Sequence, residues 1–157
     1  MKLDATDKKI LKLLQTDAKL TTKEIALKAG LSATAVFERV KKLERTKVIT
    51  GYTAILDTNL IERNFAVYCF VKLLQHTKEY VLNFERQASK LPEVLECFHV
   101  SGDYDYILKI HVKDMQEYRN FMVSKLTNID GIGSTHSSFV INEVKYSRVF
   151  DLDNASI

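Results

Sequence analysis

A turn-like stretch in the second half of the chain carries side chains that could bind a small charged molecule. Residues 101–106 read Ser-Gly-Asp-Tyr-Asp-Tyr. Gly102 would let a ligand approach the backbone closely, and the carboxylates of Asp103 and Asp105 could accept hydrogen bonds from an ammonium group. Glycine and aspartate are also ordinary turn residues, so the stretch taken alone is more typical of a solvent-exposed β-turn with a packing tyrosine.

A second stretch, from Ser32 to Arg45, carries polar and basic side chains that could contact DNA. Val36, Val40 and Leu43 recur at helical spacing and would face inward, which leaves a polar, mostly basic outer face. The candidate contacts are Ser32, Ala33, Thr34 and Ala35 at the floor of the major groove, Glu38 on the same polar face, Arg39 at a base or phosphate, and Lys41, Lys42 and Arg45 at phosphates. The alternative is a helical packing module whose basic residues are merely solvated.

The other reactive side chains form no catalytic or metal-binding pattern. The four histidines lack the spacings of zinc sites, and the chain contains no nucleophile elbow, P-loop or kinase motif. Cys69 and Cys97 lie in apolar, strand-like runs without ligand spacing, so we expect both to be buried, reduced thiols. We therefore expect no enzyme activity, no metal and no cofactor.

The net charge of +3 is distributed unevenly along the chain. Residues 1–50 contain 12 Lys/Arg against 6 Asp/Glu, a net +6, whereas residues 51–157 contain 11 against 14, a net −3. Contacts between basic side chains and phosphates release counterions and provide most sequence-independent affinity for nucleic acids. The charge pattern favours a polyanion partner for the first third of the chain, although a solvated basic surface explains it equally well.

The amino-terminal region resembles neither a secretion signal nor a membrane anchor. Residues 1–12 are charged throughout, and no apolar run approaches the roughly 18 residues needed to span a bilayer. These features predict a cytoplasmic protein without a membrane partner, associated with the nucleoid if it binds DNA.

Three short helices that could position the basic side chains are predicted in the first third of the chain. The first covers residues 4–15, Thr21 with Glu24 forms a capping box for the second, and Ser32 caps the third. Gly30 ends the second helix and permits a sharp turn, which is typical of a helix-turn-helix. We expect a DNA-binding domain at residues 1–50, with its motif at residues 22–41.

The rest of the chain predicts an α+β domain. After Ile49 the apolar periodicity changes from 3.6 to 2, first in a strand at residues 49–56 within a linker at residues 51–63. The order βαββαβ follows, with strands at 65–74, 94–100, 104–112 and 134–145 and helices at 80–90 and 115–126. Asp114 and Glu117 predict a capping box for the second helix. This order packs as a ferredoxin-like fold at residues 64–157, with both helices on one face of a four-stranded antiparallel sheet.

Several blocks in register resemble the Lrp/AsnC family of transcriptional regulators. They are residues 3–44, VITGYTAILD at 48–57, VSGDYDYILKIHV at 100–112 and FVINEVK at 139–145. The resemblance covers nearly the whole chain and is strongest to the leucine-responsive branch. It implies a three-helix, winged or plain, helix-turn-helix joined by a strand-bearing linker to a ferredoxin-like RAM domain. It also implies homodimers, an octamer as the favoured larger assembly, and amino acids as effectors.

The resemblance also assigns an effector pocket. In the family the loop at residues 101–106 lines a ligand site at a subunit interface, and the assignment falls on Gly102, Tyr104 and Asp105, with Asp103 beside them. Hydroxyls of Thr135 and Ser137 near the last strand complete the expected set. The chain departs from the family at Lys47, where glycine commonly follows the third helix, at Ala35, a frequently polar or proline position, and at Asp130, which replaces the proline of a Pro-Gly turn.

The sequence therefore predicts a DNA-binding transcriptional regulator whose assembly or DNA affinity responds to a small amino-acid effector. Its expected partners are double-stranded DNA, the effector and further copies of itself. One alternative is an amino-acid-binding metabolic enzyme, or the regulatory subunit of one. Another is a nucleoid-organising protein that wraps DNA in large assemblies.

Overall fold

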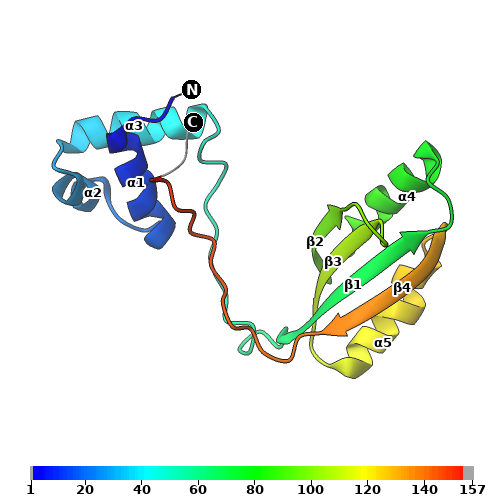
Figure 1. Cartoon of the computed structure of the whole chain (residues 1–157). Coiled ribbons are helices and arrows are strands. Elements are labelled where there is room, and N and C mark those ends of the chain that lie inside the picture. Colours follow the sequence, from blue (N-terminus) through cyan, green and yellow to red (C-terminus); the bar gives the residue numbers. More distant parts are fainter. Residues whose placement is uncertain (1, 154–157) are drawn as a thin grey trace. The chain divides into compact units, whose positions relative to one another are not determined.

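The structure, a computed structural model, describes residues 2–153 and consists of two compact units (Figure 1). Of the described residues, one unit holds 2–55 and 145–153, and the other holds 56–144. The second domain was expected to include everything from residue 64 onward, whereas residues 145–153 belong to the first unit. Within the described residues no helix is long and apolar enough to cross a membrane.

The first unit is built on three short helices, each started by a side-chain cap. They are α1 (Ala5–Thr16), α2 (Thr22–Ala29) and α3 (Ala33–Arg45). Asp4 caps α1, Thr21 and Glu24 form the predicted capping box at α2, and the Ser32 hydroxyl accepts the Ala35 amide at α3. Apolar side chains from all three helices form one core, which includes Ile10, Ile25, Val36 and Leu43. The predicted helices and their caps are thus confirmed.

The carboxy-terminal segment packs against this helical core. The side-chain amide of Gln15 on α1 donates to the Phe150 carbonyl at 3.2 Å and accepts the Phe150 amide at 2.7 Å. Leu152 packs against the core, and Asp153 forms an ion pair with Lys12 at 2.6 Å. These contacts explain why a segment far along the chain belongs to the first unit.

The second unit has the predicted βαββαβ order. Its elements are β1 (Phe65–Leu73), α4 (Lys78–Ala88), β2 (Val94–His99), β3 (Tyr106–Val112), α5 (Met115–Ser124), the 3-10 turn η1 (Leu126–Asn128) and β4 (Ile132–Phe139). The antiparallel sheet has the order β2-β3-β1-β4. Cys69 of β1 pairs with Leu108 of β3 and with Ser137 of β4, which sets the register of the central strands. The ferredoxin-like fold is confirmed.

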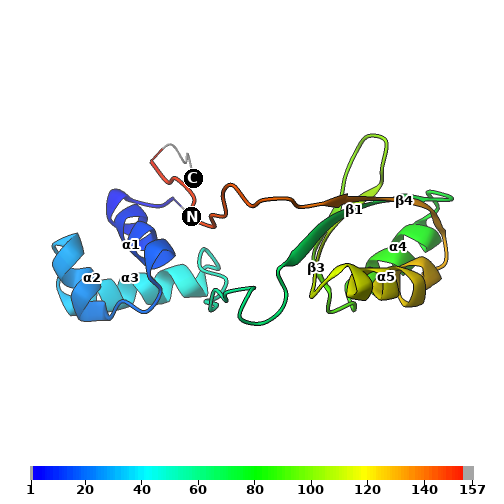
Figure 2. The ribbon, with the colours of Figure 1, turned by 90° about the horizontal axis from the view of Figure 1, so that it is seen from below.

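Both helices of the second unit cover the same face of the sheet, as Figure 2 shows. Side chains alternate along the strands, so Val67, Cys69 and Val71 of β1 are fully buried beneath α4 and α5. Phe84 of α4 and Phe121 of α5 complete this core. The opposite face carries Tyr68, Phe70, Glu96, Phe98, Ile107, Lys109 and His136 and is here called the open face.

Four local expectations are corrected. Residues 51–57 form no strand, although the alternation of apolar residues predicted one at 49–56, and β4 ends at Phe139 rather than at residue 145. A strand needs a neighbouring backbone to pair with, which alternation alone does not supply. Cys97 is exposed because it lies on the edge strand β2. Asp114 caps α5, but the Glu117 carboxylate accepts the Lys113 amide, so the capping box is incomplete.

Candidate functional site

Helix α3 presents the outer face that a helix-turn-helix offers to DNA. Its exposed residues include five of the nine predicted DNA contacts, and these are Ser32, Thr34, Glu38, Lys41 and Arg45. The other four, Ala33, Ala35, Arg39 and Lys42, are half-buried against the rest of the unit. The amino-terminal turn and one side of α3 thus share these exposed polar residues.

The turn before α3 holds that surface in place. Gly30 has φ +72°, the left-handed conformation that favours glycine, and it ends α2. The next amide, that of Leu31, donates to the Ala26 carbonyl at 3.0 Å. The chain can then reverse within a few residues, and α3 begins with its first turn exposed.

Arg39 does not point away from the domain as the sequence predicted. Its guanidinium Nη1 lies 2.7 Å from a carboxylate oxygen of Asp4 and 2.7 Å from one of Asp7. Asp7 is fully buried, and its second oxygen lies 3.9 Å from the Lys42 ammonium. The hydrogen bond from Arg39 also holds the pKa of Asp4 below its usual value. Arg39 therefore joins α3 to α1 through a buried carboxylate and is not free to read a base in this arrangement.

An aromatic ring that the sequence analysis did not assign to the site lies on the exposed face of α3. The side chain of Phe37 is 49% exposed, and the Lys41 ammonium lies 5.8 Å from the ring centroid. Lys41 also pairs with Glu44 at 2.9 Å. The position of Phe37, one residue after the inward-facing Val36, could have indicated the exposure of its ring.

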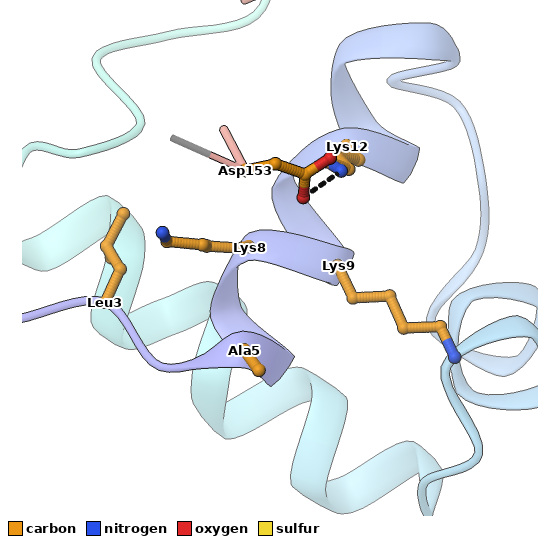
Figure 3. Close-up of a pocket in the computed structure, with 6 residues that line it drawn as sticks. All are labelled: Leu3, Ala5, Lys8, Lys9, Lys12 and Asp153. Atoms are coloured by element: carbon orange, nitrogen blue, oxygen red, sulfur yellow. Dashed lines mark hydrogen bonds and ion pairs between the residues drawn. The ribbon is translucent and has the colours of Figure 1, made fainter. Parts of the chain in front are cut away.

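A second basic region lies on α1 (Figure 3). Leu3, Ala5, Lys8, Lys9, Lys12 and Asp153 line a cavity of about 410 Å³. Lys12 forms an ion pair with Asp153 and is the main cause of the lowered pKa of that carboxyl. The charge of Lys8 lowers the pKa of Asp153 further. Lys9 extends away from Asp153 and donates to the Ala29 carbonyl at 3.4 Å. The carboxylate of Asp153 thus occupies part of this basic surface.

Asp105 of the predicted effector loop is held by two partners. One carboxylate oxygen accepts the Leu73 amide at 2.7 Å, and the other lies 2.7 Å from Nε2 of His76. Burial by itself raises the pKa of Asp105, but the hydrogen bonds from Leu73 and His76 outweigh that effect and lower it below its usual value. Asp105 is therefore a fixed carboxylate at the end of β1. The contact of His76 with this loop has no local signal in the sequence, because His76 lies 29 residues before Asp105.

The remaining effector residues are divided between the two faces of the sheet. The Tyr104 ring lies 5.4 Å from that of Phe70 and 6.3 Å from that of His136, on the open face. Thr135 and Ser137 pair with Val71 and Cys69, so their side chains point to the helix-covered face.

The Ser137 hydroxyl lies 2.5 Å from that of Tyr118 on α5. Gly102, with φ +125°, and Asp103 are exposed. Within one chain, the structure does not bring all six residues into one cavity.

The described residues contain no cluster of three or more His, Cys, Asp or Glu side chains that could hold a metal ion. Histidines take part in the site in another way. His76 contacts Asp105, and His136 lies beside Tyr104. Both contacts depend on the sheet and its loops, so sequence spacing did not reveal them.

Two family models match the chain. The AsnC-type helix-turn-helix domain matches residues 3–44, and the Lrp/AsnC ligand binding domain matches residues 66–150. The helix-turn-helix match covers α1, α2 and most of α3, and the ligand-binding match covers α4, α5 and the whole sheet except Phe65.

Curated relatives match over nearly their full length. The Bkd operon transcriptional regulator of Pseudomonas aeruginosa is 37% identical over 142 residues, which cover 90% of this chain and 93% of the relative. The leucine-responsive regulatory protein of Escherichia coli is 37% identical over 146 residues, which cover 93% of this chain and 89% of the relative.

Two solved structures share this architecture. The complex of a transcriptional regulator of Neisseria meningitidis with L-Met has a TM-score of 0.92 and 31% identity, covering 96% of this chain and 97% of that one. An AsnC family transcriptional regulator of Agrobacterium tumefaciens also has a TM-score of 0.92, with 33% identity and coverage of 96% and 98%.

Proposed function

The chain belongs to the Lrp/AsnC family of DNA-binding transcriptional regulators with a ligand-binding domain, and from that premise we propose how its two units act. The first unit binds operator DNA through α3. The second binds a small amino-acid effector that changes assembly or DNA affinity. The observation that carries the proposal is the exposed, capped amino-terminal turn of α3 beside the glycine turn.

We assign the DNA contacts according to the place of each residue on α3 and on the turn before it. The four consecutive residues Ser32, Ala33, Thr34 and Ala35 lie at the floor of the major groove. Glu38 faces the bases from the next turn, and Lys41, Lys42 and Arg45 contact phosphates. Arg39 supports the domain through Asp7, and its effect on DNA binding is indirect.

We place the effector near the loop at residues 101–106. The Asp105 carboxylate is ionised and half-buried, so it can accept a hydrogen bond from the ammonium group of a zwitterion. Gly102 and Asp103 close the pocket on the solvent side, and Tyr104 provides an aromatic wall. Thr135 and Ser137 point to the helix-covered face of β4, so in this proposal they support the pocket from behind the sheet and do not line its open-face side. The related Neisseria regulator in complex with L-Met supports an amino-acid effector.

We propose that the open face of the sheet is a homodimer interface, and that dimers assemble further into an octamer. No helix of this unit covers the open face, so its aromatic side chains are left exposed. Phe98 is 51% exposed and Tyr68 is 37% exposed there. Burial of such aromatic surface drives association. Two-fold pairing would place two α3 helices about 10 base pairs apart on palindromic DNA.

We further divide the chain by role. Residues 1–50 bind DNA, residues 51–63 link the units, and the ferredoxin-like domain from residue 64 senses the effector and assembles. The carboxy-terminal segment stabilises the DNA-binding unit. In this proposal the protein acts in the cytoplasm at the nucleoid, without catalysis and without a cofactor.

The test is DNA selection followed by a salt titration. The full-length protein is incubated with fragmented genomic DNA, and the retained fragments are measured by fluorescence anisotropy at several salt concentrations. We expect nanomolar binding that weakens steeply with salt, because several phosphates are contacted. A panel of amino acids is then added, and one or more should shift the DNA affinity and the melting temperature. Turnover of an amino-acid substrate without any retained DNA would support the metabolic-enzyme alternative instead.

A further inference from the structure

The ring of Phe37 is exposed on a helix whose other large apolar residues, Val36, Val40 and Leu43, pack into the core. Val36 and Leu43 of α3 are fully buried in the core of the unit, whereas Phe37 is 49% exposed. Single exposed apolar residues are common on proteins, so exposure alone assigns no role. The position of the ring on α3 is the informative feature.

Phe37 shares one stripe of α3 with two polar side chains of the DNA-facing surface. Thr34 lies three residues before it and Lys41 four residues after it, which places all three on one side of the helix. The Lys41 ammonium lies 5.8 Å from the ring centroid, at the distance of a cation–π contact. An element that enters the major groove with this side forward carries the phenyl ring to the edges of the bases.

Resting on the proposed function, we propose that Phe37 is a specificity-determining residue that contacts the 5-methyl group of a thymine in the major groove. A phenyl ring has no donor or acceptor, so it cannot read the hydrogen-bonding pattern of a base pair. The thymine methyl is the apolar group that the four base pairs display in the major groove. An apolar ring at this position therefore selects thymine over cytosine and also over uracil.

The experiment removes the methyl group without changing base pairing. A DNA site selected by the wild-type protein is synthesised as a series of duplexes. In each duplex deoxyuridine replaces the thymine at one position of the half-site, and the same replacement is made in both half-sites. Binding of the full-length protein is measured by fluorescence anisotropy. At one position we expect uracil to weaken wild-type binding about three- to tenfold per half-site, from the apolar area of one methyl group.

Variants of Phe37 test whether the ring reads that methyl group. Phe37→Ala should bind the thymine site more weakly and should not distinguish thymine from uracil at that position. Phe37→Leu, which keeps an apolar side chain, should restore part of the discrimination. As a matched control, Leu27→Ala removes a more exposed apolar side chain from α2 and should keep the full thymine preference. Circular dichroism checks that each variant is folded.

The outcomes separate this proposal from the function on which it rests. Suppose that wild type and Phe37→Ala both bind the selected DNA and that every uracil substitution lowers their affinities by the same factor. The ring then does not contact a thymine methyl group, and the proposal is overturned, while the proposed DNA binding stands. If the wild-type protein retains no DNA fragment, the proposed function itself fails. A thymine preference that disappears only in Phe37→Ala supports the proposal.

Discussion

The Arg39 guanidinium lies 2.7 Å from a carboxylate oxygen of Asp7, which is fully buried in the helical unit. The two residues lie 32 positions apart, on α3 and α1. A buried carboxylate that loses its cation keeps a large desolvation cost. The pair therefore makes the position of α3 depend on α1.

Arg39→Ala should destabilise the DNA-binding unit by about 2 kcal/mol, because it leaves Asp7 buried with Lys42, at 3.9 Å, as its remaining cation. The partial exposure of Arg39 limits the loss. Arg45→Ala is the matched control on the same helix. It should leave stability within about 0.5 kcal/mol of wild type and weaken DNA binding through a lost phosphate contact. Urea unfolding and anisotropy titrations measure both quantities. Equal stability of the two variants would contradict the structural role of Arg39.

Lys47→Gly should raise the free energy of unfolding by about 1 kcal/mol. Lys47 follows α3 with φ +59°, a left-handed conformation that strains residues with a Cβ atom and suits glycine. Lys47→Ala removes the same side chain beyond Cβ without relieving that strain, so it should match the wild type. Urea unfolding measures the free energies of unfolding of all three proteins. If Lys47→Ala stabilises the protein as much as Lys47→Gly, backbone strain at this position is not the cause.

Acid should destabilise the helical unit in part through Asp4. The pKa of Asp4 is lowered in the folded protein, mainly by the hydrogen bond from Arg39. A lowered folded-state pKa gives stability that is present above the unfolded-state value, near 4, and is lost as the pH falls toward the folded-state value. Asp4→Asn keeps a good N-cap and removes the titration. Between pH 7 and pH 3 the free energy of unfolding of the variant should fall less than that of the wild type. An equal fall would show that Asp4 does not contribute to acid destabilisation.

Asp105→Asn should weaken effector binding about tenfold or more while preserving the loop. Asparagine can still accept the Leu73 amide and contact His76, but it lacks the negative charge that a zwitterion's ammonium needs. Asp130→Asn, on another exposed turn, is the control and should bind normally. The measurement is calorimetric titration with the amino acid that shifts wild-type DNA binding most. Unchanged affinity in Asp105→Asn would place the effector elsewhere.

Phe98→Asp should convert the protein to monomers at micromolar concentration if the open face forms the dimer. A buried carboxylate without a partner opposes association at that face. Val123→Asp adds the same charge at an exposed apolar position on α5, on the covered side of the sheet, and should leave the dimer intact. Sedimentation velocity distinguishes the two. A Phe98→Asp protein that remains dimeric would exclude the open face as the interface.

The sequence by itself determined the elements and their order. Helix starts at Asp4, Thr21 and Ser32 depend on side chains that bond backbone amides three residues away, so a short window contains the whole signal. The change of apolar periodicity from 3.6 to 2 likewise distinguishes the helical unit from the sheet. The ferredoxin-like topology followed from that order.

Only the tertiary structure decided which polar groups meet. Arg39 with Asp7 and Asp105 with His76 are contacts between residues 32 and 29 positions apart, which packing creates and local spacing does not encode. Packing also places the segment around Leu152 on the helical core. Strand formation at residues 49–56 failed as a prediction for the same reason, because a strand exists only where another backbone lies beside it to accept and donate its hydrogen bonds.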